Sequence, residues 1–235
     1  LAPNQSTNSD SLEIIGHYFY HDVKELKDTK KVINLLITIK KNYPRIKKMF
    51  HQSKLKVDNL GSKRIINKIL NKKINEKSKI KINKKKISQN FSISKVKDTD
   101  INHYLKSRNL KINRKNSSNT KLIKKLDHYD WWFKTNRKSY LLKKGEKKIL
   151  YFYKEKLFSF KYKIFYLSGW FACTKDCEAR DILYALNWQR KENKNVSWIS
   201  FVKNNNVLSL KMSKYVGWKI MNKNNIISKK ISNKF

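Results

Sequence analysis

The sequence predicts an α+β domain in its carboxy-terminal part, preceded by a helical amino-terminal segment and a long Lys-rich extension. Between Phe158 and Tyr166 apolar residues alternate with serine and lysine, which is the period-two pattern of a half-buried strand. After residue 177, apolar residues recur at helical spacing. Most of the aromatic residues lie between Tyr129 and Trp218, and this concentration indicates where the folded core lies.

The amino-terminal segment, residues 1–58, is expected to contain an amphipathic helix. The helix is predicted from Asp22 to Asn42, with Pro44 ending it shortly afterwards. Because its apolar residues fall on one stripe, the helix needs a partner surface. The stripe consists of Val23, Leu26, Ile33, Leu36 and Ile37.

Residues 59–126 read as a basic, low-complexity extension. From Asn59 to Lys95 there are twelve basic residues and one acid, and from Ile101 to Leu126 there are eight basic residues and no acid. Such stretches cannot bury enough apolar surface to fold alone. The extension is expected either to stay solvated or to become ordered along RNA. The second reading is favoured because its isoleucines recur at helical spacing: Ile65, Ile66, Ile69 and Ile74.

Residues 127–222 are predicted to be the aromatic-rich domain, and residues 223–235 a basic tail. After the strand, a helix is expected with Thr174 or Asp176 as its cap and acids at its positive end. Two strands should follow, Val196 to Lys203 and Val207 to Met212, although a helix starting near Val207 is an alternative. The buried stripe of the expected helix is Ala179, Ile182, Leu183 and Leu186.

The charge of the chain restricts its partners. Lys and Arg number 56 against 17 Asp and Glu, a formal net charge of +39, and like charges at this density repel unless a polyanion accompanies them. A phosphate polymer is the expected counter-charge, because its binding releases condensed counterions. No apolar run approaches the roughly 18 residues of a spanning helix, so a membrane partner is not expected.

No residue pattern indicates a catalytic or metal site. Cys173 and Cys177 are four positions apart, but no histidine stands at zinc-finger spacing from them, so they read as reduced thiols. The nearest group of acids is Asp176, Glu178 and Asp181, and the positive end of a helix explains it. The sequence therefore predicts no enzyme, no cofactor, no metal and no small-molecule substrate.

Three blocks between residues 131 and 212 resemble the amino-terminal half of the universal small-subunit ribosomal protein S-three. Trp132-Phe133 resembles a Trp-Phe dipeptide near the start of that family. Fifteen residues on, Lys148-Ile149, Phe152 and Leu157 stand where the family has its first helix, and the strand from Tyr162 to Leu167 stands where its first strand follows. The third block is Trp198 to Lys203 followed by Val207 to Leu210.

The resemblance implies a KH-type RNA-binding domain. The family's Gly-x-x-Gly loop is replaced here by residues 173–176, Cys-Thr-Lys-Asp, so the KH-like domain would be degenerate. The family's carboxy-terminal domain would be missing, since only residues 213–235 follow the matched region.

The function predicted from charge and resemblance is a structural constituent of the small subunit of an organellar ribosome, which would contact ribosomal RNA and neighbouring ribosomal proteins. Lys outnumbers Arg by 49 to 7, a bias of AT-rich genes that favours a mitochondrion, with a plastid-type organelle as the alternative. The rival functions are a homing endonuclease or maturase and a basic DNA-packaging protein. The candidate rRNA-binding residues are Lys84, Lys85, Lys86, Lys134, Arg137, Lys138, Lys161, Lys163, Lys203, Lys229 and Lys230.

Overall fold

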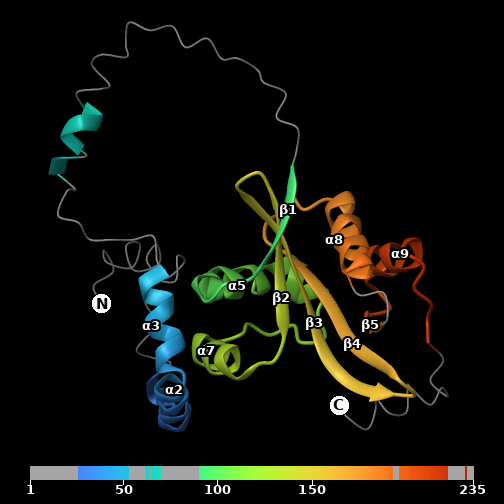
Figure 1. The fold of residues 1–235 in the computed structure, drawn as a ribbon, viewed down its shortest axis with the longest axis horizontal. Coiled ribbons are helices and arrows are strands. Elements are labelled where there is room, and N and C mark those ends of the chain that lie inside the picture. Colours follow the sequence, from blue (N-terminus) through green and yellow to red (C-terminus); the bar gives the residue numbers. More distant parts are fainter. Residues whose placement is uncertain are drawn as a thin grey trace, which may run out of the picture. The chain divides into compact units, whose positions relative to one another are not determined.

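The computed structural model describes residues 26–52, 62–63, 65–69, 90–192, 196–221 and 231. They fall into two compact units (Figure 1). The first contains the described residues of Leu1–Phe91 together with Lys97–His103 and Lys125–Lys134. The second contains Ser92–Val96, Tyr104–Lys124 and the described residues of Thr135–Phe235. The candidate residues Lys84, Lys85, Lys86, Lys229 and Lys230 lie outside the described residues.

The first unit is helical. It contains α2 (Thr29–Lys41), α3 (Tyr43–Gln52), the short 3-10 helix η3 (Asp98–Asp100) and α7 (Lys125–Lys134). Helix α2 begins at Asp28, whose carboxylate accepts a hydrogen bond from the backbone N–H of Lys31 at 3.1 Å, an N-cap. Asp22, the predicted start, lies outside the described residues. Helix α2 packs against α7, where the Thr38 hydroxyl donates to Asp130 Oδ1 at 2.6 Å.

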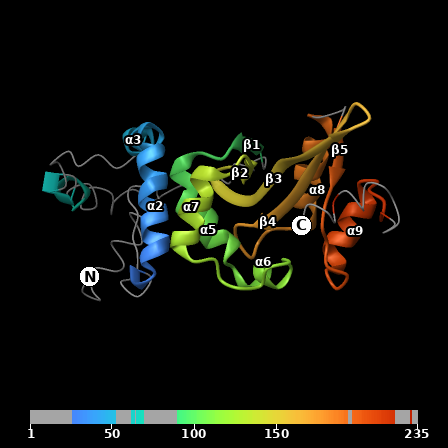
Figure 2. The same cartoon turned by 90° about the horizontal axis from the view of Figure 1, so that it is seen from below.

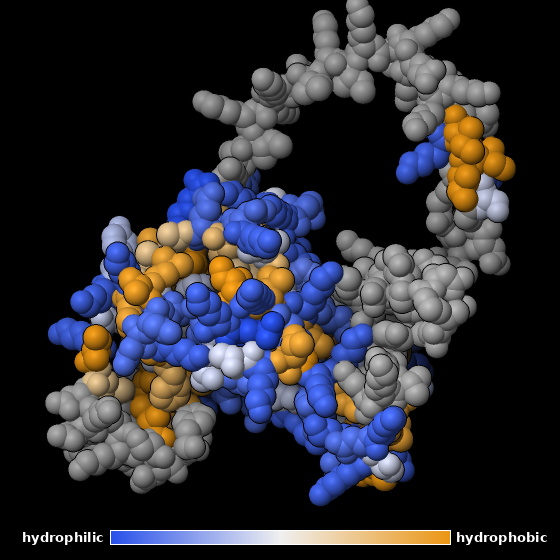
Figure 3. Space-filling model, turned by 180° about the vertical axis from the view of Figure 1, so that it is seen from behind, coloured by the Kyte–Doolittle hydropathy of each residue, from blue (hydrophilic) through white to orange (hydrophobic). Residues whose placement is uncertain are grey.

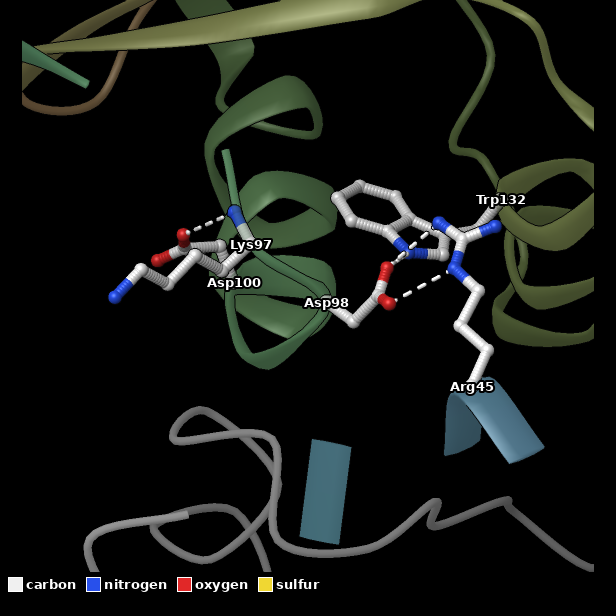
Figure 4. Close-up of polar contacts among 5 residues, drawn as sticks. All are labelled: Arg45, Lys97, Asp98, Asp100 and Trp132. Carbon is white, nitrogen blue, oxygen red and sulfur yellow. Dashed lines mark hydrogen bonds and ion pairs between the residues drawn. The ribbon is translucent and has the colours of Figure 1, made fainter. Parts of the chain in front are cut away.

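Asp98 ties α3, η3 and α7 together (Figure 4). Arg45 donates from Nε and Nη2 to the two carboxylate oxygens of Asp98 at 2.8 and 2.6 Å, a bidentate pair. The indole N–H of Trp132 donates to the same carboxylate at 2.9 Å. The guanidinium of Arg45 also lies over the ring of Phe133, 5.3 Å from its centroid. Arg45 therefore acts inside this unit.

The second unit is built on a five-stranded mixed sheet in the order β1-β2-β3-β4-β5. The strands are β1 (Phe91–Lys95), β2 (Lys138–Lys144), β3 (Lys147–Phe160), β4 (Lys163–Ala172) and β5 (Val196–Ile199). Strand β3 pairs antiparallel with β2 and with β4, whereas β4 and β5 pair in parallel. Helix α8 (Ala179–Lys191) forms the crossover that a parallel pair requires.

Helices cover both faces of the sheet, as the two ribbon views show (Figures 1 and 2). Successive residues of a strand point to opposite faces. Tyr151 of β3 contacts Tyr104 of α5 (Ile101–Arg108), with ring centroids 4.8 Å apart. The next residue, Phe152, contacts Trp188 of α8 on the other face at 5.6 Å. Helix α5 and helix α8 thus lie on opposite sides of β3.

The expectation of a KH-like domain is wrong. The residues from Lys148 to Leu157, which the family resemblance assigns to a helix, lie in β3, the longest strand of the sheet. The reason is visible in the burial of consecutive residues: Ile149, Leu150, Tyr151 and Phe152 are all buried, because this strand is covered on both faces. A helix of this sequence would expose part of that run.

The strand expected from Phe158 to Tyr166 is two strands. Lys161 and Tyr162, with φ of 46° and 63°, form the turn between β3 and β4. A two-residue hairpin turn with both φ values positive is usually built from Asn and Gly, so Lys and Tyr at these positions do not indicate a turn. Strand β5 ends at Ile199, and Val207–Tyr215 is helix α9, capped by Asn206, so the helical alternative describes this segment.

Residues 101–126 were predicted to be part of the basic extension, but this segment contains α5, α6 (Lys111–Lys115) and the first two residues of α7. The side chain of Asn113 connects α6 to the sheet by donating to the backbone carbonyls of Ser107 and Ala172 at 2.6 and 2.7 Å. The proposed division into four domains stays a prediction.

Hydrophilic side chains dominate the face shown in Figure 3, and hydrophobic residues appear there as separate patches. None of the helices in the described part of the chain has both the length and the apolar character to cross a membrane.

Candidate ligand-binding site beside strand β4

The parallel pairing of β4 and β5 is short. It begins at Ile164 opposite Val196 and ends at Leu167 opposite Ile199. Strand β4 continues for five residues beyond this point, 168–172, still paired with β3 on its other edge. A parallel pair that ends while one strand continues leaves backbone groups of that strand without a neighbouring strand. In open sheets with parallel strands, ligands bind at the carboxyl ends of the strands.

The register identifies which backbone groups face the open edge. The backbone N–H of Cys173 donates to the carbonyl of Ile149 at 2.8 Å, so Cys173 faces β3. Because facing alternates along an antiparallel pair, the backbone groups of Ala172, Trp170 and Ser168 point away from β3. The Asn113 side chain takes both groups of Ala172, donating to its carbonyl at 2.7 Å and accepting from its N–H at 3.1 Å.

Trp170 is the open position of this edge. Pairing of Leu167 with Ile199 lies on one side of it, and the Asn113 contact with Ala172 lies on the other. Within the described ranges, no side chain or backbone group bonds to the N–H or C=O of Trp170 on this edge. A backbone donor and acceptor are thus available side by side, as at a sheet edge that accepts an extended chain.

Trp198, on the neighbouring strand β5, provides a further unsatisfied donor. It stands opposite Tyr166 in the parallel pair, with ring centroids 5.8 Å apart. Its indole Nε1 is buried and has no hydrogen-bond partner among the described residues. Buried donors are rarely left unpaired, so this atom is a candidate for bonding to the carbonyl of a ligand.

Ser168 and Gln189 support the open edge from the α8 face. The Ser168 hydroxyl donates to Gln189 Oε1 at 2.9 Å, and Gln189 Nε2 donates to the carbonyl of Tyr153 at 3.2 Å. Gln189 is only 2% exposed, so this pair is fixed by packing. It attaches α8 to β3 and β4 next to the point where β5 ends.

Carboxylates of the chain itself bind backbone N–H groups at the start of α8. Glu178 and Asp181 form a capping box, in which the backbone N–H of Glu178 donates to Asp181 Oδ2 at 2.9 Å and the Glu178 side chain accepts from the third helical residue. Asp181 is fully buried, and its Oδ1 has no partner within the described residues. The cap is therefore Glu178 rather than the predicted Thr174 or Asp176.

The charges around this turn balance one another. Lys147 Nζ lies 2.5 Å from Asp176 Oδ2, and Arg180 Nε lies 2.5 Å from Glu178 Oε2. The hydrogen bond from Lys147 lowers the pKa of Asp176. Burial raises the pKa of Cys177 to about 12, and Asp181 and Glu178 add to the rise, so this thiol stays protonated. No group of three or more metal-ligating side chains is found in the described residues.

The structure places the candidate basic residues in several separate settings. Lys134 ends α7 and pairs with Asp130, Nζ to Oδ1, at 2.6 Å. Lys138 is exposed at the start of β2, whereas Lys203 is partly buried in the loop after β5. Lys161 and Lys163 flank the tip of the β3–β4 hairpin, where Lys161 Nζ lies 5.6 Å from the ring centroid of Phe160.

Arg137 has an internal role. Its Nε and Nη2 atoms donate to Glu155 Oε2 at 3.1 and 2.9 Å, and its guanidinium carbon lies 3.9 Å from the ring centroid of Tyr153. Sequence reasoning missed Asn113, Ser168 and Gln189 entirely. No local pattern marks them, because each bonds to a residue at least 21 positions away in the chain.

Several of the solved structures that are similar to this chain are acetyltransferases. No family model matches the sequence, and no curated protein matches it either. A domain from Methanocaldococcus jannaschii is similar in structure, at 20% identity, with a TM-score of 0.47, over 58% of this chain and 93% of that chain. An aminoglycoside 6'-N-acetyltransferase of Acinetobacter haemolyticus is similar at 12% identity, with a TM-score of 0.43, over 56% and 92%.

A further similar structure is a candidate acetyltransferase of Salmonella typhimurium, solved with its cofactor acetyl-CoA. It is 10% identical, with a TM-score of 0.42, over 56% of this chain and 81% of that chain. Strand β3 contradicts the S-three resemblance, and with it the ribosomal scaffold role that this resemblance implied. The similar structures contradict the expectations of no enzyme, no small-molecule substrate and an rRNA partner. They give no support to the nuclease, maturase or DNA-packaging alternatives. The mitochondrial location stays a prediction.

Proposed function

We propose that the sheet unit is an N-acetyltransferase-type domain that receives the extended arm of an acyl donor along the open edge of β4. The observation that supports this most directly is the end of the parallel pair at Leu167, which leaves the backbone of Trp170 open. An acyl thioester built on pantetheine has amide groups along an extended chain, and such a chain pairs with a strand edge through main-chain hydrogen bonds.

The arm of acetyl-CoA fits the residues of this edge. Trp170 offers an N–H and a C=O to an amide of the arm, and the buried indole N–H of Trp198 offers a donor to a carbonyl. When bound, the arm would carry the acyl group as a thioester. The chain's residues would hold and orient that arm and exclude water from it, and the pair of Ser168 and Gln189 would keep the edge in place.

The diphosphate of acetyl-CoA does not fit the first turn of α8. A helix N-terminus binds phosphate through free backbone N–H groups and its positive dipole. Here the capping box of Glu178 and Asp181 already takes N–H groups of that turn and places negative charge there. We therefore derive no step through the nucleotide part of this cofactor, and the proposal concerns the arm alone.

The test uses S-acetyl-pantetheine, which has no phosphate. This matters because a chain of net charge +39 binds phosphate compounds through charge alone. Binding to the full chain is measured by calorimetry for wild type, Trp170→Pro and Trp170→Ala. Proline removes the outward N–H but not a bond to β3, whereas alanine keeps the N–H and removes the side chain.

The proposal expects S-acetyl-pantetheine to bind the wild type, and Trp170→Pro to bind it about fivefold or more weakly than Trp170→Ala, the effect of one hydrogen bond. Circular dichroism checks that both variants fold. Release of free thiol in the presence of a polyamine reports transfer. Absence of binding to the wild type, or equal binding by the two variants, contradicts the proposal.

A further inference from the structure

A second site is indicated on the α5 side of the sheet, where Arg108 and Arg137 stand with a single carboxylate, that of Glu155, which pairs with Arg137. The charge of Arg137 is neutralised by Glu155, because Arg137 donates two hydrogen bonds to Glu155 Oε2. Its side chain is 22% exposed and that of Glu155 is 38% exposed, so the pair is partly withdrawn from water. Attraction to Tyr153, Tyr104 and Glu155 outweighs burial and raises the pKa of Arg137.

Arg108, the last residue of α5, has no such counter-ion among the described residues. It is half-buried and donates from Nη2 to the hydroxyl of Ser117, a neutral group. No carboxylate of the described chain pairs with it. Burial lowers the pKa of Arg108, the phenols of Tyr153 and Tyr104 oppose this, and the positive charge of Arg137 lowers it further.

Geometry places the two guanidiniums on the same part of the sheet. Tyr104 lies one helical turn before Arg108 on the same face of α5, and its hydroxyl is 3.3 Å from Ser139 Oγ. Ser139 pairs across the sheet with Tyr153, whose ring lies against Arg137.

The C-terminal end of α5 compensates only part of this charge. A helix terminus carries the equivalent of about half an elementary charge, whereas a guanidinium carries a full one and does not deprotonate in proteins. A partly buried cation without a counter-ion is costly, and a bound anion removes that cost. Guanidinium groups bind planar carboxylates and phosphates through paired N–H donors.

We propose that Arg108 and Arg137 bind the anionic group, a carboxylate or a phosphate, of a small ligand on the α5 side of the sheet. Ser117 positions Arg108, and Glu155 positions Arg137 against the ring of Tyr153. This site is separate from the open edge of β4 and does not depend on acyl transfer.

The experiment measures binding of inorganic phosphate and of acetate to the full chain by calorimetry at constant ionic strength set with chloride. The variants are Arg108→Gln, Arg108→Lys and Lys106→Gln. Lys106 is exposed on the same helix, so Lys106→Gln removes the same charge without touching the site, and it reports the non-specific attraction of a basic chain.

The wild type and Lys106→Gln are expected to bind phosphate or acetate alike, and Arg108→Gln to bind about tenfold or more weakly, the loss of one charge-assisted contact. Arg108→Lys keeps the positive charge but lacks the paired N–H donors of the guanidinium, so it is expected to bind several-fold more weakly than the wild type. Binding of phosphate alone, or of acetate as well, identifies the anionic group. No binding of either anion, or equal binding by both Arg108 variants and the wild type, overturns the proposal. If Arg108→Gln does not fold, Arg108→Lys decides.

Discussion

Protonation of His128 should destabilise the first unit. This side chain is 3% exposed on α7, and its Nε2 lies 3.0 Å from the carbonyl oxygen of Ile101. Burial lowers the pKa of His128 from 6.5 to about 4, and the hydrogen bond to Ile101 opposes this only in part. The folded protein therefore holds a neutral imidazole at a pH where the unfolded chain already binds a proton.

Proton linkage gives the direction and the size of the change in stability with pH. Between the two pKa values the unfolded state binds more protons than the folded state, so stability falls as the pH falls. The full contribution of His128 is present above the unfolded pKa of 6.5 and is lost as the pH falls to the folded pKa of about 4. The whole difference corresponds to about 3 kcal/mol, and about 2 kcal/mol of it is lost by about pH 5.

Urea unfolding followed by tryptophan fluorescence measures this, because Trp131 and Trp132 lie on the same helix as His128. Unfolding at about pH 7 and about pH 5 is compared for wild type, His128→Gln and His51→Gln. Glutamine keeps a donor for the Ile101 carbonyl but does not titrate, so His128→Gln should lose most of the decrease. His51 is exposed, and its variant should keep the wild-type decrease. An unchanged decrease in His128→Gln would refute the assignment.

Three further substitutions test the sheet unit. Gly169→Ala should lower the free energy of unfolding by about 1–3 kcal/mol, because a Cβ there would lie 2.6 Å from Tyr153 Cζ. In a double-mutant cycle, the same substitution should cause a smaller loss in a Tyr153→Ala background. Asn113→Ala should cost about 1–3 kcal/mol by leaving Ala172 backbone groups unpaired, and thermal unfolding should reveal it; a loss within about 0.5 kcal/mol would contradict the contact. Asn206→Ala removes the cap that accepts from Ser209 N–H at 3.2 Å and should cost about 1 kcal/mol in urea unfolding, whereas Asn206→Asp should be nearly neutral.

Helices with one apolar face were predictable from the sequence. The helix expected after residue 177 is α8, and Ile182 and Leu186 of its expected stripe are buried. Helical spacing survives in a single sequence because one face alone meets the core. The predicted helix before Asn42 is present as α2, but its expected stripe is wrong. Leu35 and Thr38 are the buried residues of α2. The described members of the expected stripe are all exposed: Leu26, Ile33, Leu36 and Ile37.

The long strand β3 was not predictable in this way. Its residues from Ile149 to Phe152 are buried on both faces, so no alternation of apolar and polar residues remains to distinguish strand from helix. The turn at Lys161 and Tyr162 gave no signal either, because it is made by residues that rarely adopt positive φ. With both features hidden, a family resemblance across residues 148–167 assigned a helix and one strand to what is an antiparallel hairpin.

Net charge overstated the role of individual basic residues. Arg45 and Arg137 each donate two hydrogen bonds to one carboxylate and lie against an aromatic ring, so the charge of each is already paired within the chain. Composition counts such arginines together with solvated lysines, although only the second kind is available to a polyanion in bulk solution. The pairs cannot be read from the sequence, because Arg45 and Asp98 are 53 positions apart.

The acids at the start of α8 have a consequence for ligand binding that goes beyond stabilising the helix. Asp176, Glu178 and Asp181 were predicted to lie at the positive end of a helix. In the structure, Glu178 and Asp181 form the capping box of α8. A helix end that is neutralised by its own carboxylates no longer attracts a phosphate. Under the proposed function, the arm of the acyl donor would therefore pair with the open edge of β4, whereas its diphosphate would meet a turn whose donors are already used.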